Sequence, residues 1–315
     1  MKKLLMMADT GTPLEERLRA LSPDLEVIAA QDEQEAMAHI ADAEIFYGTI
    51  TPELFRQARR LRWIQTPMAG LERYFFPELV ASDVVVTNMR GIYSDNIADH
   101  VFGYILCFAR NLHHYIRMQE RRIWDKTPRP VVHLADCTLG IVGLGGIGYE
   151  VARRGYVCGM RVLAVDPRRE DRPPEVAELW KPDRLDDLLA QSDFVVVTVP
   201  QTPETTGLFD AARFARMKPT AYFINIGRGK VVRLDALTEA LQQGRIAGAG
   251  LDVFEIEPLP ADHPLWGMEN VIITPHVAGV GPHTAERRWA VVVENVRRYL
   301  TGEPLLNVVD KALGY

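Results

Sequence analysis

Three ionisable side chains in the second half of the sequence follow apolar stretches and could act together in one reaction. Arg228 lies in NIGRG, Glu257 in LDVFEIEP and His276 in ITPHVAG. The carboxyl ends of parallel strands meet at one edge of an open α/β sheet, where ligands bind. A guanidinium can hold a carboxylate through two parallel hydrogen bonds. An imidazole titrates near neutral pH, as a general acid or base must.

This combination suits hydride transfer to or from a 2-oxo acid. Arg228 would bind the substrate carboxylate, and His276 would protonate the carbonyl oxygen as hydride reaches the carbon. Glu257 would hold the tautomer of the imidazole and stabilise its charged form. Each residue also has a structural reading: a surface arginine, a loop acid and a structural histidine. We favour the catalytic reading because all three follow predicted buried strands.

A glycine-rich turn could hold the hydride carrier. VGLGGIGYEV, residues 142–151, places Gly143, Gly145 and Gly148 in the spacing G-x-G-x-x-G. An apolar stretch precedes the turn, a helical pattern follows it, and the next apolar stretch ends in Asp166, 18 residues after Gly148 (166 − 148). This spacing is typical of a dinucleotide-binding βαβ unit, in which a helix N-terminus faces the phosphates.

The residues around Asp166 bear on which dinucleotide binds. An acid at this position accepts hydrogen bonds from the ribose hydroxyls and would repel a 2′-phosphate. We therefore expect NAD as the cofactor. Arg168 and Arg169 lie close by in DPRRED and could pair with a phosphate, so NADP stays possible.

Alternating apolar and helical patterns indicate how these residues are positioned. The expected strands cover residues 3–8, 26–30, 43–49, 61–66, 83–88, 138–142, 160–166, 194–200, 221–227 and 246–253. Helices are expected after the Thr-Pro pairs at 12–13 and 51–52, and over 95–117, 233–244 and 283–302. Such alternation predicts parallel sheets covered by helices.

Bulk composition limits the class of protein. With 315 residues, two domains are expected. A net charge of −6 (36 basic and 42 acidic residues) disfavours a nucleic-acid binder. Cys107, Cys137 and Cys158 have no metal-binding spacing, so we expect no metal and a reduced, cytoplasmic protein. We also expect neither a signal peptide nor a membrane span.

Several motifs together resemble one family. GLGGIG, VPQTPET, FINIGRGKVV, GLDVFEIEPLP, HPLW and TPHVAG occur in the order found in D-isomer-specific 2-hydroxyacid dehydrogenases. The resemblance implies two doubly wound parallel-sheet domains. A Rossmann dinucleotide-binding domain, residues 98–283, would be inserted in a flavodoxin-like substrate domain formed by 1–97 and 284–315. The cleft between them would hold NAD(H) or NADP(H).

The resemblance also assigns roles to particular residues. It implies Arg228 as the carboxylate clamp, Glu257 as the orienting acid and His276 as the acid/base, with the backbone of Ala69 and Gly70 also receiving the substrate. Asp252 would contact the nicotinamide carboxamide, and Gly146 and Ile147 would lie under the pyrophosphate. The cofactor site is expected to comprise Gly143, Gly145, Gly146, Ile147, Gly148, Asp166, Pro200, Thr206, Ile226, Gly227, Arg228, Asp252, His276 and Gly279.

The activity implied is interconversion of a small D-2-hydroxy acid and its 2-oxo acid, such as glyoxylate or hydroxypyruvate. We expect a homodimer that binds neither nucleic acid nor membrane. A non-catalytic dinucleotide sensor on the same fold is the alternative, and formate oxidation is a third reading. The Arg, Glu and His set favours the enzyme, because neither alternative needs a proton donor. Lys230, where the family commonly has a small or neutral residue, could affect substrate choice or face solvent.

Overall fold

The chain folds into two compact units, each built on one sheet. The computed structural model describes residues 1–71, 74–311 and 313–314. The first unit comprises Met1–Ile92 and Pro282–Tyr315, and the second comprises Tyr93–Gly281. The second unit thus begins at 93 where the sequence suggests 98, and the chain returns to the first unit at 282 instead of 284.

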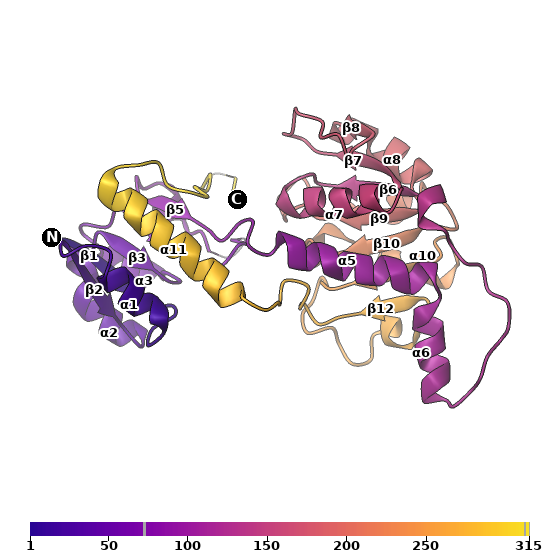
Figure 1. Ribbon diagram of the computed structural model, residues 1–315, viewed down its shortest axis with the longest axis horizontal. Coiled ribbons are helices and arrows are strands. Elements are labelled where there is room, and N and C mark those ends of the chain that lie inside the picture. Colours follow the sequence, from indigo (N-terminus) through magenta and orange to yellow (C-terminus); the bar gives the residue numbers. More distant parts are fainter. Residues whose placement is uncertain (72–73, 312, 315) are drawn as a thin grey trace. The chain divides into compact units, whose positions relative to one another are not determined.

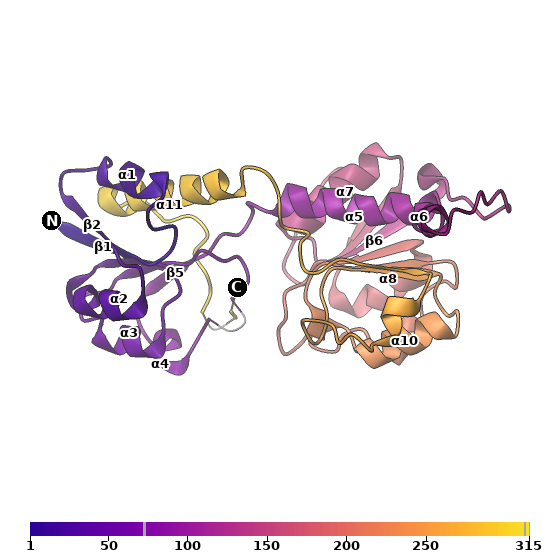
Figure 2. The same ribbon diagram turned by 90° about the horizontal axis from the view of Figure 1, so that it is seen from below.

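The first unit is a five-stranded sheet in the order β2-β1-β3-β4-β5, with every pairing parallel. This is the flavodoxin-like winding. Figure 2 shows α1 and α11 on one face of the sheet and α2, α3 and α4 on the other. The strands are β1 Lys2–Met6, β2 Leu25–Ala29, β3 Ile45–Tyr47, β4 Trp63–Gln65 and β5 Val85–Thr87. The helices are α1 Pro13–Arg19, α2 Glu33–His39, α3 Pro52–Gln57, α4 Pro77–Val80 and α11 Thr284–Thr301.

The second unit is a seven-stranded parallel sheet in the order β12-β11-β10-β9-β6-β7-β8 (Figure 1). Read from β8, this is the Rossmann winding with one added strand. Helices α5, α6 and α7 lie on one face, and α8 and α10 on the other (Figure 2). The strands are β6 Thr138–Val142, β7 Arg161–Val165, β8 Glu178–Trp180, β9 Phe194–Val197, β10 Tyr222–Asn225, β11 Gly248–Leu251 and β12 Val271–Ile273. The helices are α5 Ser94–Ala109, α6 Leu112–Glu120, α7 Gly146–Val157, α8 Leu185–Gln191, α9 Ala211–Phe214 and α10 Leu234–Gln242.

The central strand of the second sheet, β9, is apolar along its whole length because helices cover both faces of the sheet. All four residues of β9, with the sequence FVVV, are buried. The predicted fold class, two doubly wound parallel sheets, is confirmed. The stops predicted at two glycines are also found, since Gly244 and Gly302 both follow their helices with positive φ, 64° and 75°.

Two differences from the sequence-based expectation concern the helix after β5 and the strand β8. The single helix predicted over 95–117 is two helices, because the chain turns at Asn111, whose φ is 56°. Asparagine tolerates this left-handed conformation, and the Asn111 amide donates a hydrogen bond to Pro130 O at 2.7 Å. Strand β8 was not predicted, since its three residues carry no alternating or continuous apolar pattern.

No helix in the described part of the chain has both the length and the apolar character needed to cross a membrane.

Candidate active site

The glycine-rich turn joins β6 to α7 at the point where the winding of the second sheet reverses. Gly143 has φ 97° and donates a hydrogen bond to Val165 O at 2.8 Å, which ties the turn to β7. A Cβ at Gly148 would lie 2.0 Å from Gly143 O, so only glycine lets α7 approach this closely. A Cβ at Gly145 would meet nothing within 4 Å. The turn therefore offers open space beside a helix N-terminus, as a pyrophosphate requires.

The Asp166 carboxylate holds two loops together beside this turn. Its Oδ2 accepts the Leu144 N–H at 2.7 Å, and its Oδ1 accepts the N–H groups of Arg168 and Arg169, both at 2.9 Å. A carboxylate has about four acceptor positions, so three are used within the described chain and about one is left for a ribose hydroxyl. The Arg169 guanidinium donates to Leu144 O at 3.1 Å and lies 5.1 Å from the Tyr149 ring. An acid and an arginine thus both flank the expected ribose position.

Arg228 is flanked by two glycines that permit very close backbone contacts. A Cβ at Gly227 would lie 2.7 Å from Val199 O, and one at Gly229 would lie 1.8 Å from Phe254 O. The loop that carries Arg228 is therefore packed directly against the backbone of the loops after β9 and β11. The Arg228 guanidinium donates to Gly227 O at 2.7 Å.

Asn225, the last residue of β10, fixes the same loop from inside. Its amide nitrogen donates to Arg228 O at 3.1 Å, and its amide oxygen accepts the Gly227 N–H at 3.1 Å. Asn225 is buried, as is the neighbouring Ile226. Asn225 is not among the site residues predicted from the sequence, although a polar residue inside the apolar run AYFINIG is a detectable signal.

His276 and Glu257, 19 residues apart in the sequence, form a hydrogen-bonded pair. His276 Nδ1 lies 2.8 Å from Glu257 Oε2, and Glu257 Oε1 accepts the Phe254 N–H at 2.9 Å. Because a carboxylate accepts the bond, we assign the proton to Nδ1 and leave Nε2 for a reacting group. The side chains are 53% and 37% exposed, so a ligand could reach the imidazole.

Asp252 organises the backbone around His276. Its carbonyl oxygen accepts the His276 N–H at 2.9 Å, and its carboxylate accepts the N–H groups of Val277 and Ala278 at 2.9 and 3.0 Å. These bonds satisfy a carboxylate that is only 2% exposed. His276 itself has φ 55°, a conformation that is uncommon for residues other than glycine.

The loop after β9 contacts the Arg228 region through its backbone. The Thr205 hydroxyl donates to Pro200 O at 2.7 Å, and the Thr206 hydroxyl donates to Thr202 O, also at 2.7 Å. The Gly207 N–H then donates to Lys230 O at 2.8 Å. Lys230 is exposed.

Other predicted residues have simpler surroundings. Ile147 packs partly buried against the core of the second unit. A Cβ at Gly146 would lie 3.0 Å from Ser94 Oγ, and one at Gly279 would lie 3.6 Å from a ring carbon of Tyr93. In the first unit, Ala69 and Gly70 follow β4, and the Asn88 amide donates to Ala69 O at 2.8 Å. No metal-binding cluster of His, Cys, Asp and Glu occurs among the described residues.

A Rossmann sheet with an open glycine turn, together with an arginine and a His–Glu pair beyond its strands, defines a dinucleotide-dependent dehydrogenase. Comparison with known proteins gives the family. The NAD-binding domain model of the D-isomer specific 2-hydroxyacid dehydrogenases matches residues 102–278, more than half of the chain (177 of 315). The chain belongs to this family and is an NAD(P)-dependent oxidoreductase.

Individual relatives agree over nearly the whole length. A glyoxylate reductase of Korarchaeum cryptofilum (strain OPF8) is 39% identical over 267 residues, covering 83% of this chain and 80% of that one. The structure of a D-isomer specific 2-hydroxyacid dehydrogenase from Xanthobacter autotrophicus Py2, in complex with NADPH and MES, matches with a TM-score of 0.85 and 33% identity. The match covers 100% of this chain and 99% of that one. The D-lactate dehydrogenase of Aquifex aeolicus, with NAD and lactic acid, has a TM-score of 0.78 and 29% identity, covering 98% and 99%.

Proposed function

We propose that this enzyme reduces a small 2-oxo acid of the glyoxylate type to the corresponding D-2-hydroxy acid. The observation that carries the proposal is the 2.8 Å contact between His276 Nδ1 and Glu257 Oε2, since it prepares an imidazole for proton transfer. The relative of K. cryptofilum, named as a glyoxylate reductase, supports the substrate class.

Each residue has a separate role in the proposed reaction. NAD(P)H, when bound, supplies the hydride. Arg228 binds the substrate carboxylate, and the two flanking glycines fix its backbone against neighbouring loops. His276, charged by a proton on each ring nitrogen, donates the Nε2 proton to the carbonyl oxygen. Glu257 accepts from Nδ1 and so stabilises the charged imidazole before the transfer.

The residues of the glycine turn fit the cofactor that this reaction needs. We propose that the pyrophosphate lies at Gly143, Gly145, Gly146, Ile147 and Gly148, and that Asp166 accepts from the adenosine ribose. Asp252 would accept from the nicotinamide carboxamide. The remaining contacts would come from Pro200, Thr206, Ile226, Gly227 and Gly279.

A substrate panel tests this function. We would measure oxidation of NADH and of NADPH with glyoxylate, hydroxypyruvate and pyruvate, and repeat the assay with His276→Gln. Turnover of at least one acid, lost in the variant, supports the proposal. Tight NADH binding with no turnover of any 2-oxo acid would point instead to a substrate of another class. We expect a preference for NADH, because the Asp166 carboxylate opposes a 2′-phosphate, with Arg169 allowing some use of NADPH.

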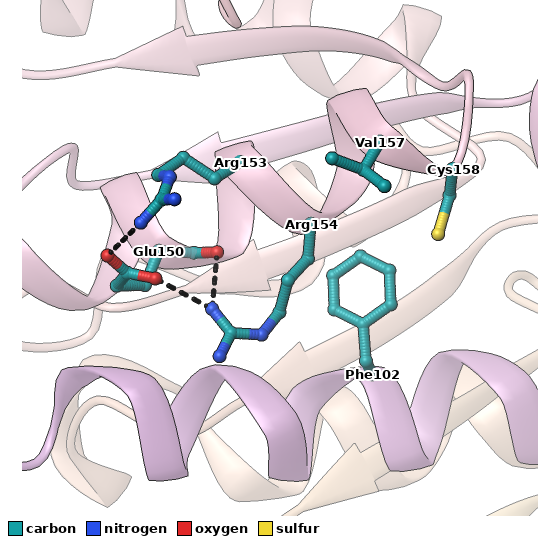
Figure 3. A pocket seen from close by; sticks show the side chains of 6 residues that line it. All are labelled: Phe102, Glu150, Arg153, Arg154, Val157 and Cys158. Atoms are coloured by element: carbon teal, nitrogen blue, oxygen red, sulfur yellow. Dashed lines mark hydrogen bonds and ion pairs between the residues drawn. The ribbon is translucent and has the colours of Figure 1, made fainter.

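We further propose that the enzyme is a homodimer that associates through one face of the second unit. Several large apolar side chains there are more than a third exposed. They lie on α5, α6, the segment 121–133 and α7, and comprise Leu106, Leu112, Tyr115, Ile116, Ile123, Trp124, Val131, Tyr156 and Val157. Helices α5 and α7 pack side by side, and a shallow pocket opens between them (Figure 3). The pocket is lined by Phe102, Glu150, Arg153, Arg154, Val157 and Cys158.

The charges in this pocket favour a second copy of the chain as the occupant. Glu150 pairs with Arg153 at 2.9 Å and with Arg154 at 2.8 Å (Figure 3). Arg154 also pairs with Asp99 at 2.8 Å, so two carboxylates balance two guanidinium groups. Charges that are neutralised within the chain do not repel an identical surface. Sedimentation or light scattering should show a dimer, and Val157→Asp should weaken it. A monomeric unmodified protein at micromolar concentration would contradict the proposal.

The cysteines support a reducing compartment. Cys107, Cys137 and Cys158 are all free thiols. Burial raises the pKa of the Cys137 thiol to about 11, so it stays protonated and unreactive at neutral pH. We therefore propose the cytoplasm as the location of the enzyme.

A further inference from the structure

A cluster of polar side chains connects α5 to the segment that carries His276. The Thr274 hydroxyl, two residues before His276, donates a hydrogen bond to Asp252 Oδ1 at 2.5 Å. The Tyr104 hydroxyl contacts the same Thr274 oxygen, and His100 Nε2 lies 3.0 Å from it. Residues about 170 positions apart in the sequence thus share one hydroxyl group.

The direction of each hydrogen bond follows from counting donors and acceptors. An ionised carboxylate only accepts, and a threonine hydroxyl has one donor and two acceptor positions. Since Thr274 gives its proton to Asp252, Tyr104 and His100 must both donate to Thr274. Burial raises the pKa of Tyr104, so its hydroxyl keeps its proton. Burial also lowers the pKa of His100, and this effect outweighs the negative charge of Asp252, which acts in the opposite direction. The ring is therefore neutral, with its proton on Nε2.

The rest of the fold makes room for this cluster. His100 and Tyr104 are four residues apart on α5 and so lie on one face of the helix. Their ring centroids are 4.8 Å apart with the planes nearly perpendicular. A Cβ at Gly250 of β11 would lie 2.7 Å from Tyr104 Cγ, so the strand has a glycine where the ring approaches it.

We propose that Thr274, Tyr104 and His100 are positioning residues for the acid–base step. The two α5 side chains donate hydrogen bonds to the Thr274 hydroxyl, and this hydroxyl holds the Asp252 carboxylate. Asp252 in turn holds the backbone of residues 276–278 through its hydrogen bonds. The inference rests on the proposed role of His276. It matters because the left-handed conformation of His276 persists only where its surroundings hold it.

The Thr274 hydroxyl can be removed without changing the shape of the side chain. Thr274→Val should lower kcat for glyoxylate reduction roughly 10- to 100-fold, since misplacing a reacting group by about 1 Å can cost about 100-fold. Without any ligand, it should also speed amide hydrogen exchange at Val277 and Ala278, whose N–H groups bond to Asp252. Thr274→Ser keeps the hydroxyl and should restore both properties. Unchanged exchange and kcat in Thr274→Val, or no rescue by serine, would overturn the proposal.

A double-variant cycle tests whether Tyr104 acts through Thr274. Tyr104→Phe should reduce kcat, and the combination with Thr274→Val should be no worse than Thr274→Val alone. Losses that simply multiply would overturn the proposed route. The control is Tyr222→Phe on β10, because the Tyr222 hydroxyl has no hydrogen bond among the described residues; it should leave kcat unchanged.

The two proposals can fail separately. If the unmodified protein reduces no 2-oxo acid, the proposed function is wrong, and amide exchange in Thr274→Val and Tyr104→Phe still decides whether the cluster holds the His276 segment. If the unmodified protein is active and both variants match it in rate and exchange, only the positioning proposal is wrong.

Discussion

Replacing Gly229 by alanine should disable the site without touching any group that reacts. The new Cβ would lie 1.8 Å from Phe254 O, 1.9 Å from Phe254 C and 2.5 Å from Glu255 N. All three are backbone atoms, so no change of rotamer relieves the contact. Reaching even a tight 3.0 Å requires a relative shift of 1.2 Å (3.0 − 1.8) between the Arg228 loop and the Phe254 loop.

This shift would be passed on to the proposed acid. The Phe254 N–H holds Glu257 Oε1, and Glu257 Oε2 holds His276 Nδ1, so movement of the Phe254 peptide displaces the pair relative to Arg228. A misplacement of about 1 Å can cost about 100-fold in rate, and we expect a loss of this order in kcat/KM for glyoxylate. Overpacking costs about 1–3 kcal/mol, less than a typical stability of about 5–15 kcal/mol, so the variant should fold.

The assay compares kcat/KM, the melting temperature and NADH affinity of Gly229→Ala with those of Gly267→Ala. Gly267 is the matched control, because a Cβ there meets nothing within 4 Å. The control should behave as the unmodified protein does. If Gly229→Ala is folded and as active as Gly267→Ala, the two loops do not set the geometry of one site, and the assignment of Arg228 and Glu257 to a common reaction is wrong.

Other perturbations test separate parts of the site and fold. His276→Gln should lower kcat about 10²- to 10⁴-fold with NADH affinity kept; a loss below tenfold would exclude a general acid. Arg228→Ala should cost about 2–5 kcal/mol in kcat/KM, and Arg228→Lys should also be poor, so full activity of the lysine variant at low substrate would refute two-point binding. In the first unit, hydrogen bonds from Arg297 lower the pKa of Glu294 and Glu303 to about 2, from an ordinary 4.5. Their contribution to stability is therefore complete above pH 4.5 and lost as the pH falls through 2; Arg297→Ala should flatten this part of the urea-unfolding profile, and an unchanged profile would contradict it.

The sequence predicts the fold and the candidate site residues because both depend on local pattern. The spacing from Gly148 to Asp166 locates the βαβ unit, and the rule that ligands bind beyond parallel strands selects Arg228, Asp252 and His276. The structure places Asp166 and the glycine turn in direct contact, since Leu144 N–H bonds to the carboxylate.

What the sequence does not reveal depends on contacts between distant segments. Nothing near His100 or Tyr104 indicates that they meet Thr274, because only the packing of α5 against the sheet brings them together. The break at Asn111 is similar: the residue fits the helical pattern, and its bond to Pro130 O decides the turn. Helix propensity is a weak preference that such tertiary contacts override.

At position 276, the residue that best fits the backbone conformation is not the residue that the proposed reaction needs. Glycine adopts φ near 55° without steric cost and asparagine at little cost, whereas other residues in sparsely populated conformations pay of order 1–3 kcal/mol. Neither glycine nor asparagine can donate a proton as imidazolium does. In a lineage that no longer needs the reaction, replacement of His276 by glycine or asparagine would therefore be favoured by stability. Persistence of histidine here among descendants of this protein would be a sign of continued selection for activity, independent of selection for the fold.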